Sequence, residues 1–136
     1  MKTTASRIAV ADTDRTVLEL LQIRLELSGH RVYVSRDSAE LMEAVKNARP
    51  NAMILDYNLQ GAGAKGVMEE LRRKSLLTFP VLLMGRNLTP ENLQEIMQLG
   101  ARSCIVKPFS GQDILERVSW LMRPAPAARP VHYLNV

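Results

Sequence analysis

The chain has 136 residues, the usual size of one domain, and apolar residues make up 46% of it. A chain of this length can bury a core without a structural metal, and its single cysteine, Cys104, excludes an internal disulfide and a cysteine-based zinc site. The formal charge is +4, but the basic residues are scattered, and only Arg72, Arg73 and Lys74 are contiguous. We therefore expect no nucleic-acid binding by this chain, no contact with a membrane, and a cytoplasmic location.

Short apolar runs alternate with longer segments of helical periodicity in the first half of the chain. Capping residues and turn residues mark where the helices begin and end. In chain order, the pattern predicts a buried strand at 8–11, a helix from the N-cap Asp14 to Gly29, a more amphipathic strand at 31–35, a helix that Asp37 or Ser38 caps and that ends before Pro50, and a third strand at 52–55.

The second half continues the same alternation. It predicts, in order, a helix around 67–71 after a loop with three glycines, a strand at 81–84, a helix from the N-cap Thr89 to Gly100, a strand at 103–106, and a last helix from Ser110 to Leu121. Such an alternation predicts an α/β fold in which helices cover both faces of a parallel sheet. We expect one domain at 7–122, followed by a tail or linker at 123–136 that is rich in proline and alanine.

Polar residues and one glycine stand where four of the predicted strands end. Asp12 and Asp14 follow the first strand, Asp56 follows the third, Gly85 the fourth, and Lys107 the fifth. Open α/β sheets bind their ligands at this end of the strands. The acids could hold a divalent cation there, and the lysine could neutralise a phosphoryl group. The alternative is a purely structural role, in which the first two acids cap the first helix and the lysine pairs with the third acid.

The motifs around these residues resemble the receiver domain of two-component response regulators. They are the segments IAVAD at 8–12, MILDYNL at 53–59, LGA at 99–101 and IVKPF at 105–109. The resemblance implies a flavodoxin-like fold with strand order 2-1-3-4-5 and five helices on both faces of the sheet. It also implies phosphotransfer to an aspartate from a histidine kinase or a phosphotransfer protein, with Mg²⁺ required. The chain would then be a bacterial signalling protein and not an enzyme, beyond catalysing its own phosphorylation.

The resemblance assigns roles residue by residue. It makes Asp56 the candidate phosphoacceptor and Lys107 the contact to the phosphoryl group, with a cis peptide bond between Lys107 and Pro108. The Mg²⁺ ion would be held by Asp12, Asp56 and the backbone carbonyl of Asn58.

Four positions depart from the pattern of the family. Thr13 stands where the family has a second acid that binds the metal, Gly85 where it has Ser or Thr, and Cys104 where it has an aromatic switch. Gly63 lies where the family has Asp-Gly, and the loop around it should be more flexible. We therefore predict an atypical receiver with weak or lost Mg²⁺ binding and weak or absent phosphorylation at Asp56, which signals mainly by binding partners.

The resemblance also implies a partner surface made by the fourth helix, the fifth strand and the fifth helix. Trp120 would lie on this surface or beside it. Its partner would be the kinase, the phosphotransfer protein or a downstream protein, and a homodimer is an alternative. The residues expected on this surface are Glu91, Gln94, Glu95, Cys104 and Gln112.

Two other classes of function compete with this interpretation. The segment 12–17 matches the Asp-x-Asp-x-Thr-Val opening of haloacid-dehalogenase-type phosphatases, in which Asp12 would be the nucleophile. That hypothesis lacks a later acidic pair for the metal and leaves Asp56 unexplained. Alternatively, the chain is a functional phospho-accepting receiver of a transcription regulator, with the tail as the linker to a missing DNA-binding domain. The tail could instead be a docking peptide anchored by Tyr133 and Leu134, or a frayed end.

Overall fold

The computed structural model describes residues 5–123, so all of the predicted tail except its first residue lies outside the described part of the chain. Strands and helices alternate throughout the described part, as the sequence predicts. They are β1 (Arg7–Ala11), α1 (Arg15–Leu27), β2 (Arg31–Ser35), α2 (Ser38–Ala48), β3 (Ala52–Asp56), α3 (Gly63–Arg73), β4 (Val81–Gly85), α4 (Pro90–Gln98), β5 (Ser103–Val106) and α5 (Gly111–Leu121).

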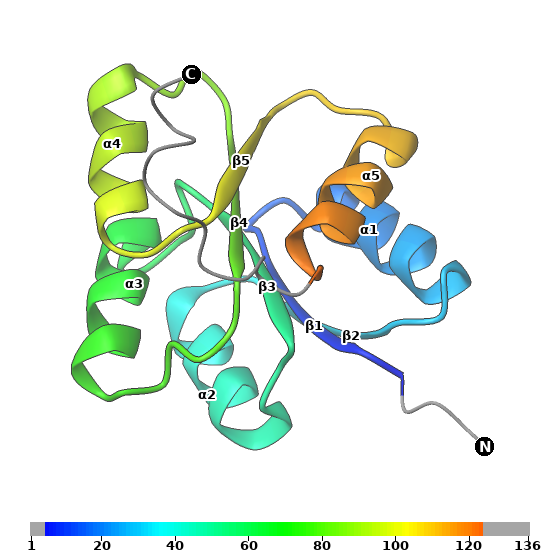
Figure 1. Cartoon of the computed structure of the whole chain (residues 1–136), viewed down its shortest axis with the longest axis horizontal. Coiled ribbons are helices and arrows are strands. Elements are labelled where there is room, and N and C mark those ends of the chain that lie inside the picture. Colours follow the sequence, from blue (N-terminus) through cyan, green and yellow to red (C-terminus); the bar gives the residue numbers. More distant parts are fainter. Residues whose placement is uncertain (1–4, 124–136) are drawn as a thin grey trace, which may run out of the picture.

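The five strands form one parallel sheet in the order β2-β1-β3-β4-β5 (Figure 1). The prediction of a flavodoxin-like α/β fold with this order is therefore confirmed. The order reverses between β1 and β3, because the chain adds β2 on one side of β1 and then returns to the other side. Connections on the two sides leave the sheet in opposite directions, which opens a crevice at the carboxyl ends of β1 and β3.

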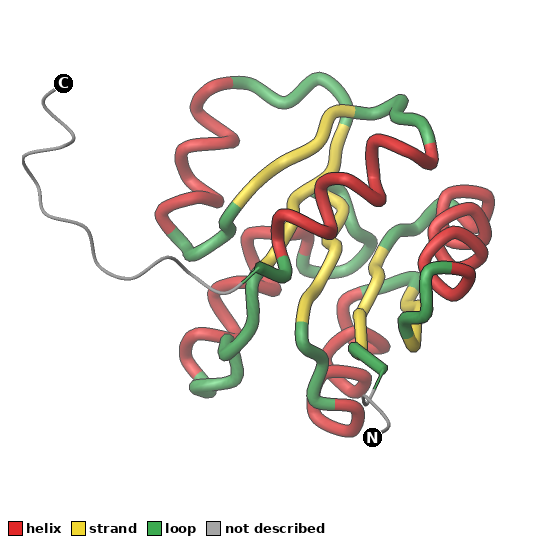
Figure 2. Tube along the Cα trace, turned by 45° about the vertical axis from the view of Figure 1, so that its right-hand side comes forward, coloured by secondary structure: helices red, strands yellow, loops and turns green. Residues whose placement is uncertain are grey.

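Helices cover both faces of the sheet, and each face has its own apolar core. Figures 1 and 2 show α1 and α5 on one face and α2, α3 and α4 on the other. Alternate residues of a strand serve the two faces: in β3, Ile54 packs with the α1 and α5 side, whereas Met53 and Leu55 pack with the other side. Because β3 and β4 lie in the middle of the sheet, every residue of both strands is buried, including Asp56.

Arginines from neighbouring elements cap the carbonyl ends of three helices. Arg7 donates to the carbonyl oxygens of Ala48 and Arg49 at the end of α2, at 2.9 Å each. Arg72 donates to the carbonyl of Gln98, the last residue of α4, and Arg102 donates to the carbonyl of Leu121, the last residue of α5. Cations at these ends satisfy carbonyl groups that lack a partner within the helix and complement the helix dipole. The cluster 72–74 thus includes a structural arginine.

The elements differ from the predicted ones mainly at their ends. The third helix begins at Gly63, four residues before the apolar residues that predicted it, and β3 and β4 extend by one residue to include Asp56 and Gly85. The cis peptide bond between Lys107 and Pro108 is present as predicted. Within residues 5–123, no helix is both long and apolar enough to cross a bilayer.

Candidate functional site

An ion-pair cluster lies in the crevice where the strand order reverses. Asp12 follows β1, Asp56 ends β3, and Lys107 follows β5, so three connections of the fold meet there. The Nζ atom of Lys107 lies 2.5 Å from Oδ2 of Asp12 and 2.9 Å from Oδ1 of Asp56. All three side chains are at least nine-tenths buried. The structure therefore brings together the acids and the lysine that the sequence places far apart.

The charges in this cluster are not balanced, because one lysine faces two carboxylates. Burial raises the pKa of Asp56, and the charge of Asp12 raises it further, although the hydrogen bond from Lys107 acts in the opposite direction. Burial alone would lower the pKa of Lys107, but the hydrogen bonds and charges of the two acids outweigh burial and raise it. Lys107 is therefore held in its charged form, whereas Asp56 ionises less readily than a carboxyl group in water.

Asp14 does not belong to the cluster, although the sequence places it at the same strand end. Its carboxylate accepts a hydrogen bond from the backbone N–H of Thr16 at 2.9 Å and caps α1. Its own N–H donates to Oδ1 of Asp12 at 2.8 Å. The structural alternative for Asp14 is thus correct, and Asp12 has one oxygen bound to the backbone and the other to Lys107.

The residues present fit a divalent cation only in part. Asp12 and Asp56 supply carboxylate oxygens. The candidate for a third ligand is the backbone carbonyl of Asn58, two residues after Asp56. No group of three acidic, histidine or cysteine side chains suited to a metal exists among residues 5–123. The position that would add the third carboxylate carries the neutral hydroxyl of Thr13.

The hydroxyl of Thr13 is already engaged in hydrogen bonds that join three loops. It accepts from the backbone N–H of Gln60 at 2.9 Å and donates to the carbonyl of Arg36 at 3.4 Å. The guanidinium of Arg36 in turn donates to the carbonyl of Thr13 at 3.2 Å. We call these three residues the Thr13 latch. It ties the loops after β1, β2 and β3 together on the β2 side of the crevice.

The loop between β3 and α3 is also bonded to the start of α2. The N–H of Ser38 donates to the carbonyl of Gln60 at 2.9 Å, and the N–H of Ala62 donates to the hydroxyl of Ser38 at 3.0 Å. Gly61 and Gly63 adopt positive φ angles of 98° and 71°, and a Cβ atom at Gly61 would lie 2.3 Å from the Ser38 hydroxyl. The glycines thus provide the turns and the close approach that this docking requires. The loop that we expected to be more flexible is held by side-chain and backbone hydrogen bonds.

The opposite side of the crevice is filled at Gly85. A Cβ atom at this position would lie 2.9 Å from Cδ2 of Leu88 and 3.2 Å from Cβ of Tyr57. Leu88 and Tyr57 are partly buried and pack against the core on the side of α2, α3 and α4. The space next to a hydroxyl-bearing side chain at position 85 is therefore occupied by apolar atoms. Leu88 could not be identified from the sequence, because its contact with this position depends on how the loop after β4 folds back.

The residues predicted for the partner surface lie on α4, β5 and α5. Glu91, Gln94 and Gln112 are exposed, whereas Cys104 is partly buried and packs against the core below α4. Glu95 forms an ion pair with Lys65 of α3, with 3.3 Å between Nζ and Oε2.

Two large apolar side chains of β5 and α5 are also exposed. Val106 and Trp120 are 58% and 65% exposed, so Trp120 is not a core residue. The guanidinium of Arg123 lies over the Trp120 ring at 3.9 Å from its centroid.

The fold is an α/β module with a buried carboxylate–lysine cluster at the switch point of its sheet. The chain matches the response regulator receiver domain over residues 8–119. It belongs to this family, and it is thus a receiver domain of the two-component response regulators, a class of signalling domain. The family match does not favour the phosphatase hypothesis. In that hypothesis the second aspartate of the motif, Asp14, would act as a general acid or base, but its carboxylate caps α1.

Curated relatives extend beyond the length of this chain. The chain is 29% identical over 126 residues to the alkaline phosphatase synthesis transcriptional regulatory protein PhoP of Bacillus subtilis, which covers 91% of this chain and 51% of the relative. It is 31% identical over 120 residues to the transcriptional regulatory protein PrrA of Mycobacterium tuberculosis, which covers 88% of this chain and 51% of the relative. The chain spans about half the length of these relatives.

Solved structures of single receiver domains superpose over nearly their whole length. The chemotaxis protein CheY4 of Vibrio cholerae aligns with a TM-score of 0.82 at 22% identity, covering 87% of this chain and 99% of that chain. A CheY-like receiver domain protein of Methanospirillum hungatei aligns with a TM-score of 0.82 at 21% identity, covering 88% and 94%. At these identities the comparisons establish the fold alone.

Removing the shared cation of the cluster should destabilise the protein. The substitution Lys107→Met leaves Asp12 and Asp56 buried together without a counter-charge, and we expect it to lower the free energy of unfolding by about 3 kcal/mol at pH 7. Adding Asp56→Asn to this variant removes one of the two facing charges and should restore most of the loss. Denaturant unfolding of the wild type and the two variants checks this, and a Lys107→Met variant as stable as the wild type would contradict it.

The raised pKa of Asp56 gives the substitution Asp56→Asn a defined pH dependence. Because the folded-state pKa lies above the usual value of 3.8, the native state binds this proton more tightly than the unfolded state, and stability falls as pH rises through that pKa. Asn imitates the neutral carboxyl, so the variant should be more stable than the wild type at pH 7. The difference should shrink as the pH is lowered through the raised pKa. Unfolding curves from pH 7 to pH 4 measure it, and a difference that grows on acidification would refute the assignment.

The Thr13 latch can be tested with a near-isosteric change. Thr13→Val removes the hydroxyl but keeps the shape, and we expect a loss of about 1 kcal/mol in stability together with faster amide hydrogen exchange at Gln60. Thr16→Val is the matched control, because Thr16 is exposed in α1 and its hydroxyl makes no hydrogen bond to a described residue. Equal exchange rates at Gln60 in both variants would show that the latch does not hold the loop.

Proposed function

We propose that this chain is an atypical receiver domain of a phosphorelay pathway that acts mainly by binding other proteins, with weak or absent phosphorylation at Asp56. The proposal rests on Thr13 and on the hydrogen bonds of its hydroxyl. Thr13 stands in place of a metal-binding acid, and its hydroxyl is used to hold the loops after β2 and β3. A reduced affinity for Mg²⁺ follows, because this ion favours carboxylate ligands and loses its bound water reluctantly.

The residues that would hold Mg²⁺ are Asp12, Asp56 and the carbonyl of Asn58. When bound, the ion would neutralise charge on an incoming phosphoryl group. Lys107 would remain the protein's own cation for that group, and its two ion pairs hold its Nζ between the two carboxylates. In the transfer, a carboxylate oxygen of Asp56 would form the new P–O bond while the P–N bond to a histidine of the donor breaks. Burial of Asp56 opposes its ionised form and thus its nucleophilicity.

Two departures beyond the metal site support slow phosphorylation and a weak conformational response. Gly85 has no hydroxyl to bond a phosphoryl oxygen, and Leu88 occupies the adjoining space. Cys104, in the place of the aromatic switch, is small and partly buried in contact with the core. Neither residue can report the state of Asp56 to the surface by a large side-chain movement.

The surface of α4, β5 and α5 is the region that we propose for binding a histidine kinase, a phosphotransfer protein or a downstream target. Its exposed apolar residues Met97 and Val106 lie among polar side chains, a composition suited to a reversible protein contact. Arg117 of α5 bonds to the carbonyl of Cys104 at 2.7 Å and fixes α5 against β5. A homodimer through the same surface is the competing arrangement.

A second candidate is a phospho-accepting receiver of a transcription regulator. It is favoured by the curated relatives, which are named transcriptional regulators and are about twice as long as the matched segment. In that case the output domain would lie outside this chain. Asp56 and Lys107 would then be sufficient for phosphorylation that regulates the output domain.

Phosphorylation by a small acyl phosphate in the presence of Mg²⁺, followed by intact mass, separates these candidates. We expect little modification of the wild type, and Thr13→Asp should increase both Mg²⁺ affinity and modification severalfold by adding the missing carboxylate. Thr13→Asn is the matched control, since it also breaks the latch but adds no charge. Asp56→Asn should abolish any modification. Rapid stoichiometric modification of the wild type at Asp56 would overturn the proposal in favour of the second candidate.

A further inference from the structure

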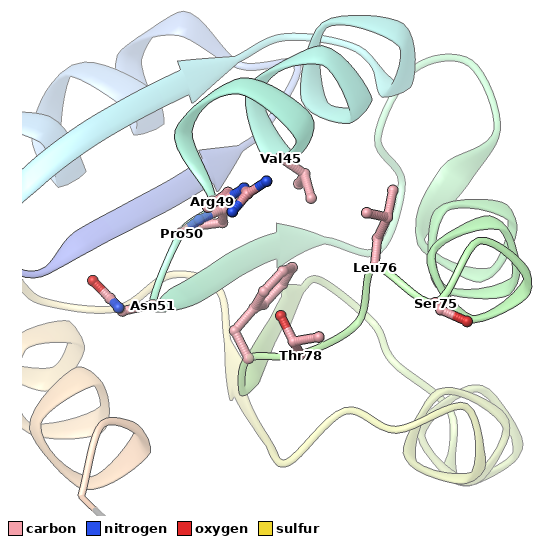
Figure 3. Close-up of a pocket in the computed structure, with 8 residues that line it drawn as sticks. Val45, Arg49, Pro50, Asn51, Ser75, Leu76 and Thr78 are labelled. Atoms are coloured by element: carbon pink, nitrogen blue, oxygen red, sulfur yellow. The ribbon is translucent and has the colours of Figure 1, made fainter.

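A pocket lies at the end of the sheet opposite the ion-pair cluster. Its volume is about 500 Å³, which is in the range of sites that hold small molecules. It is open to the surface and lined by the last turn of α2, the chain that leads into β3, and the connection from α3 to β4 (Figure 3). β3 begins beside the pocket and ends at Asp56, so the two sites are separated by the length of a strand, roughly 15 Å.

The walls of the pocket combine an apolar part with one cationic group. Val45 and Phe79 are buried core residues that line it, and Leu76 faces Val45 from the connection after α3. Among the described residues, Arg49 is the only charged one in the lining, and no carboxylate accompanies it there. Its guanidinium forms no hydrogen bond or ion pair with any residue in 5–123, although its backbone carbonyl accepts two hydrogen bonds from Arg7. The backbone of Arg49 is therefore fixed while its charged end remains available.

The backbone conformation of the lining also requires explanation. Arg49 and Ser75 have φ angles of 49° and 57°, and they are two of the three non-glycine residues with positive φ within 5–123. Each follows the end of a helix, where glycine is usual because it adopts this conformation without strain. Here a guanidinium and a hydroxyl occupy those positions instead, and both residues line the same pocket. Strained residues that cluster at one cavity point to a function for their side chains.

We propose that this pocket binds a small organic anion, with its carboxylate or phosphate on the guanidinium of Arg49 and a compact apolar body against Val45, Leu76 and Phe79. A guanidinium forms paired, charge-assisted hydrogen bonds with either anionic group. Thr78 lines the pocket, and Figure 3 shows its hydroxyl turned toward the interior, where it could bind a second oxygen of the ligand. The site is independent of phosphorylation at Asp56 and does not rest on the function proposed above.

The substitution Arg49→Gly separates binding from folding. Glycine relieves the positive φ angle, so this variant should be at least as stable as the wild type, whereas loss of the guanidinium should weaken anion binding roughly tenfold or more. Phenyl phosphate is the probe, and amide chemical shifts of the pocket residues report its binding. Arg73→Gln is the matched control, because Arg73 is an exposed arginine of α3 outside the lining and its loss changes the net charge equally.

We expect saturable shifts at Leu76, Thr78 and Phe79 at millimolar phenyl phosphate, with weaker binding of inorganic phosphate and of uncharged benzyl alcohol. Arg73→Gln should leave the affinity nearly unchanged. The proposal is overturned by shifts that do not saturate, by equal losses in both variants, or by inorganic phosphate binding as tightly as phenyl phosphate. If benzoate replaces phenyl phosphate at similar affinity, the site takes carboxylates as well; if it does not bind, the site is specific for phosphate. Either result supports an organic-anion site.

Discussion

One lysine shared between two buried carboxylates is the interaction on which the open end of this sheet depends. Asp12, Asp56 and Lys107 lie at the ends of three different strands, and within residues 5–123 no other ion pair joins these strand ends. Without the lysine, the two carboxylates would repel each other. Even with the lysine present, the pKa of Asp56 is raised. The same imbalance that makes the pocket costly for stability makes it attractive to a cation or to a reagent that neutralises Asp56.

The residue at position 13 affects the excess of negative charge in the cluster, and thus how strongly the cluster would attract a metal ion. A carboxylate at this position would add negative charge to the pocket and require a cation to balance it. The threonine adds none, and its hydroxyl instead connects the β1, β2 and β3 loops by neutral hydrogen bonds. The loops are thus held in position without an ion. A receiver that keeps its pocket assembled in this way can present a constant surface to a partner, and this links the proposed loss of metal affinity to the proposed role in protein binding.

The sequence was sufficient for the fold because each strand and helix carries a local signal. The buried strands are apolar on both faces, and the helices have capping residues such as Asp14 and Thr89. Strand order came from the resemblance and not from periodicity, which does not distinguish one order from another. The acids and the lysine were identifiable because the carboxyl ends of parallel strands meet at one edge. Whether Asp14 joined them was open, and only its bond to Thr16 decided that it caps α1.

What the sequence could not supply were contacts between loops. Glycine at position 85 indicated a missing hydroxyl, but only the return of Leu88 onto β4 shows that its space is filled. Gly63 alone predicted a more flexible loop, because glycine restrains the backbone less than other residues do. In the folded chain the same lack of a side chain allows the backbone to approach Ser38 closely, so the glycines make a tight contact possible. The positions at which this receiver departs from the family pattern can be read from the sequence. Their consequences depend on contacts between neighbouring loops, which fill the space left at Gly85 and bond the hydroxyl of Thr13, and these contacts are a property of the tertiary structure.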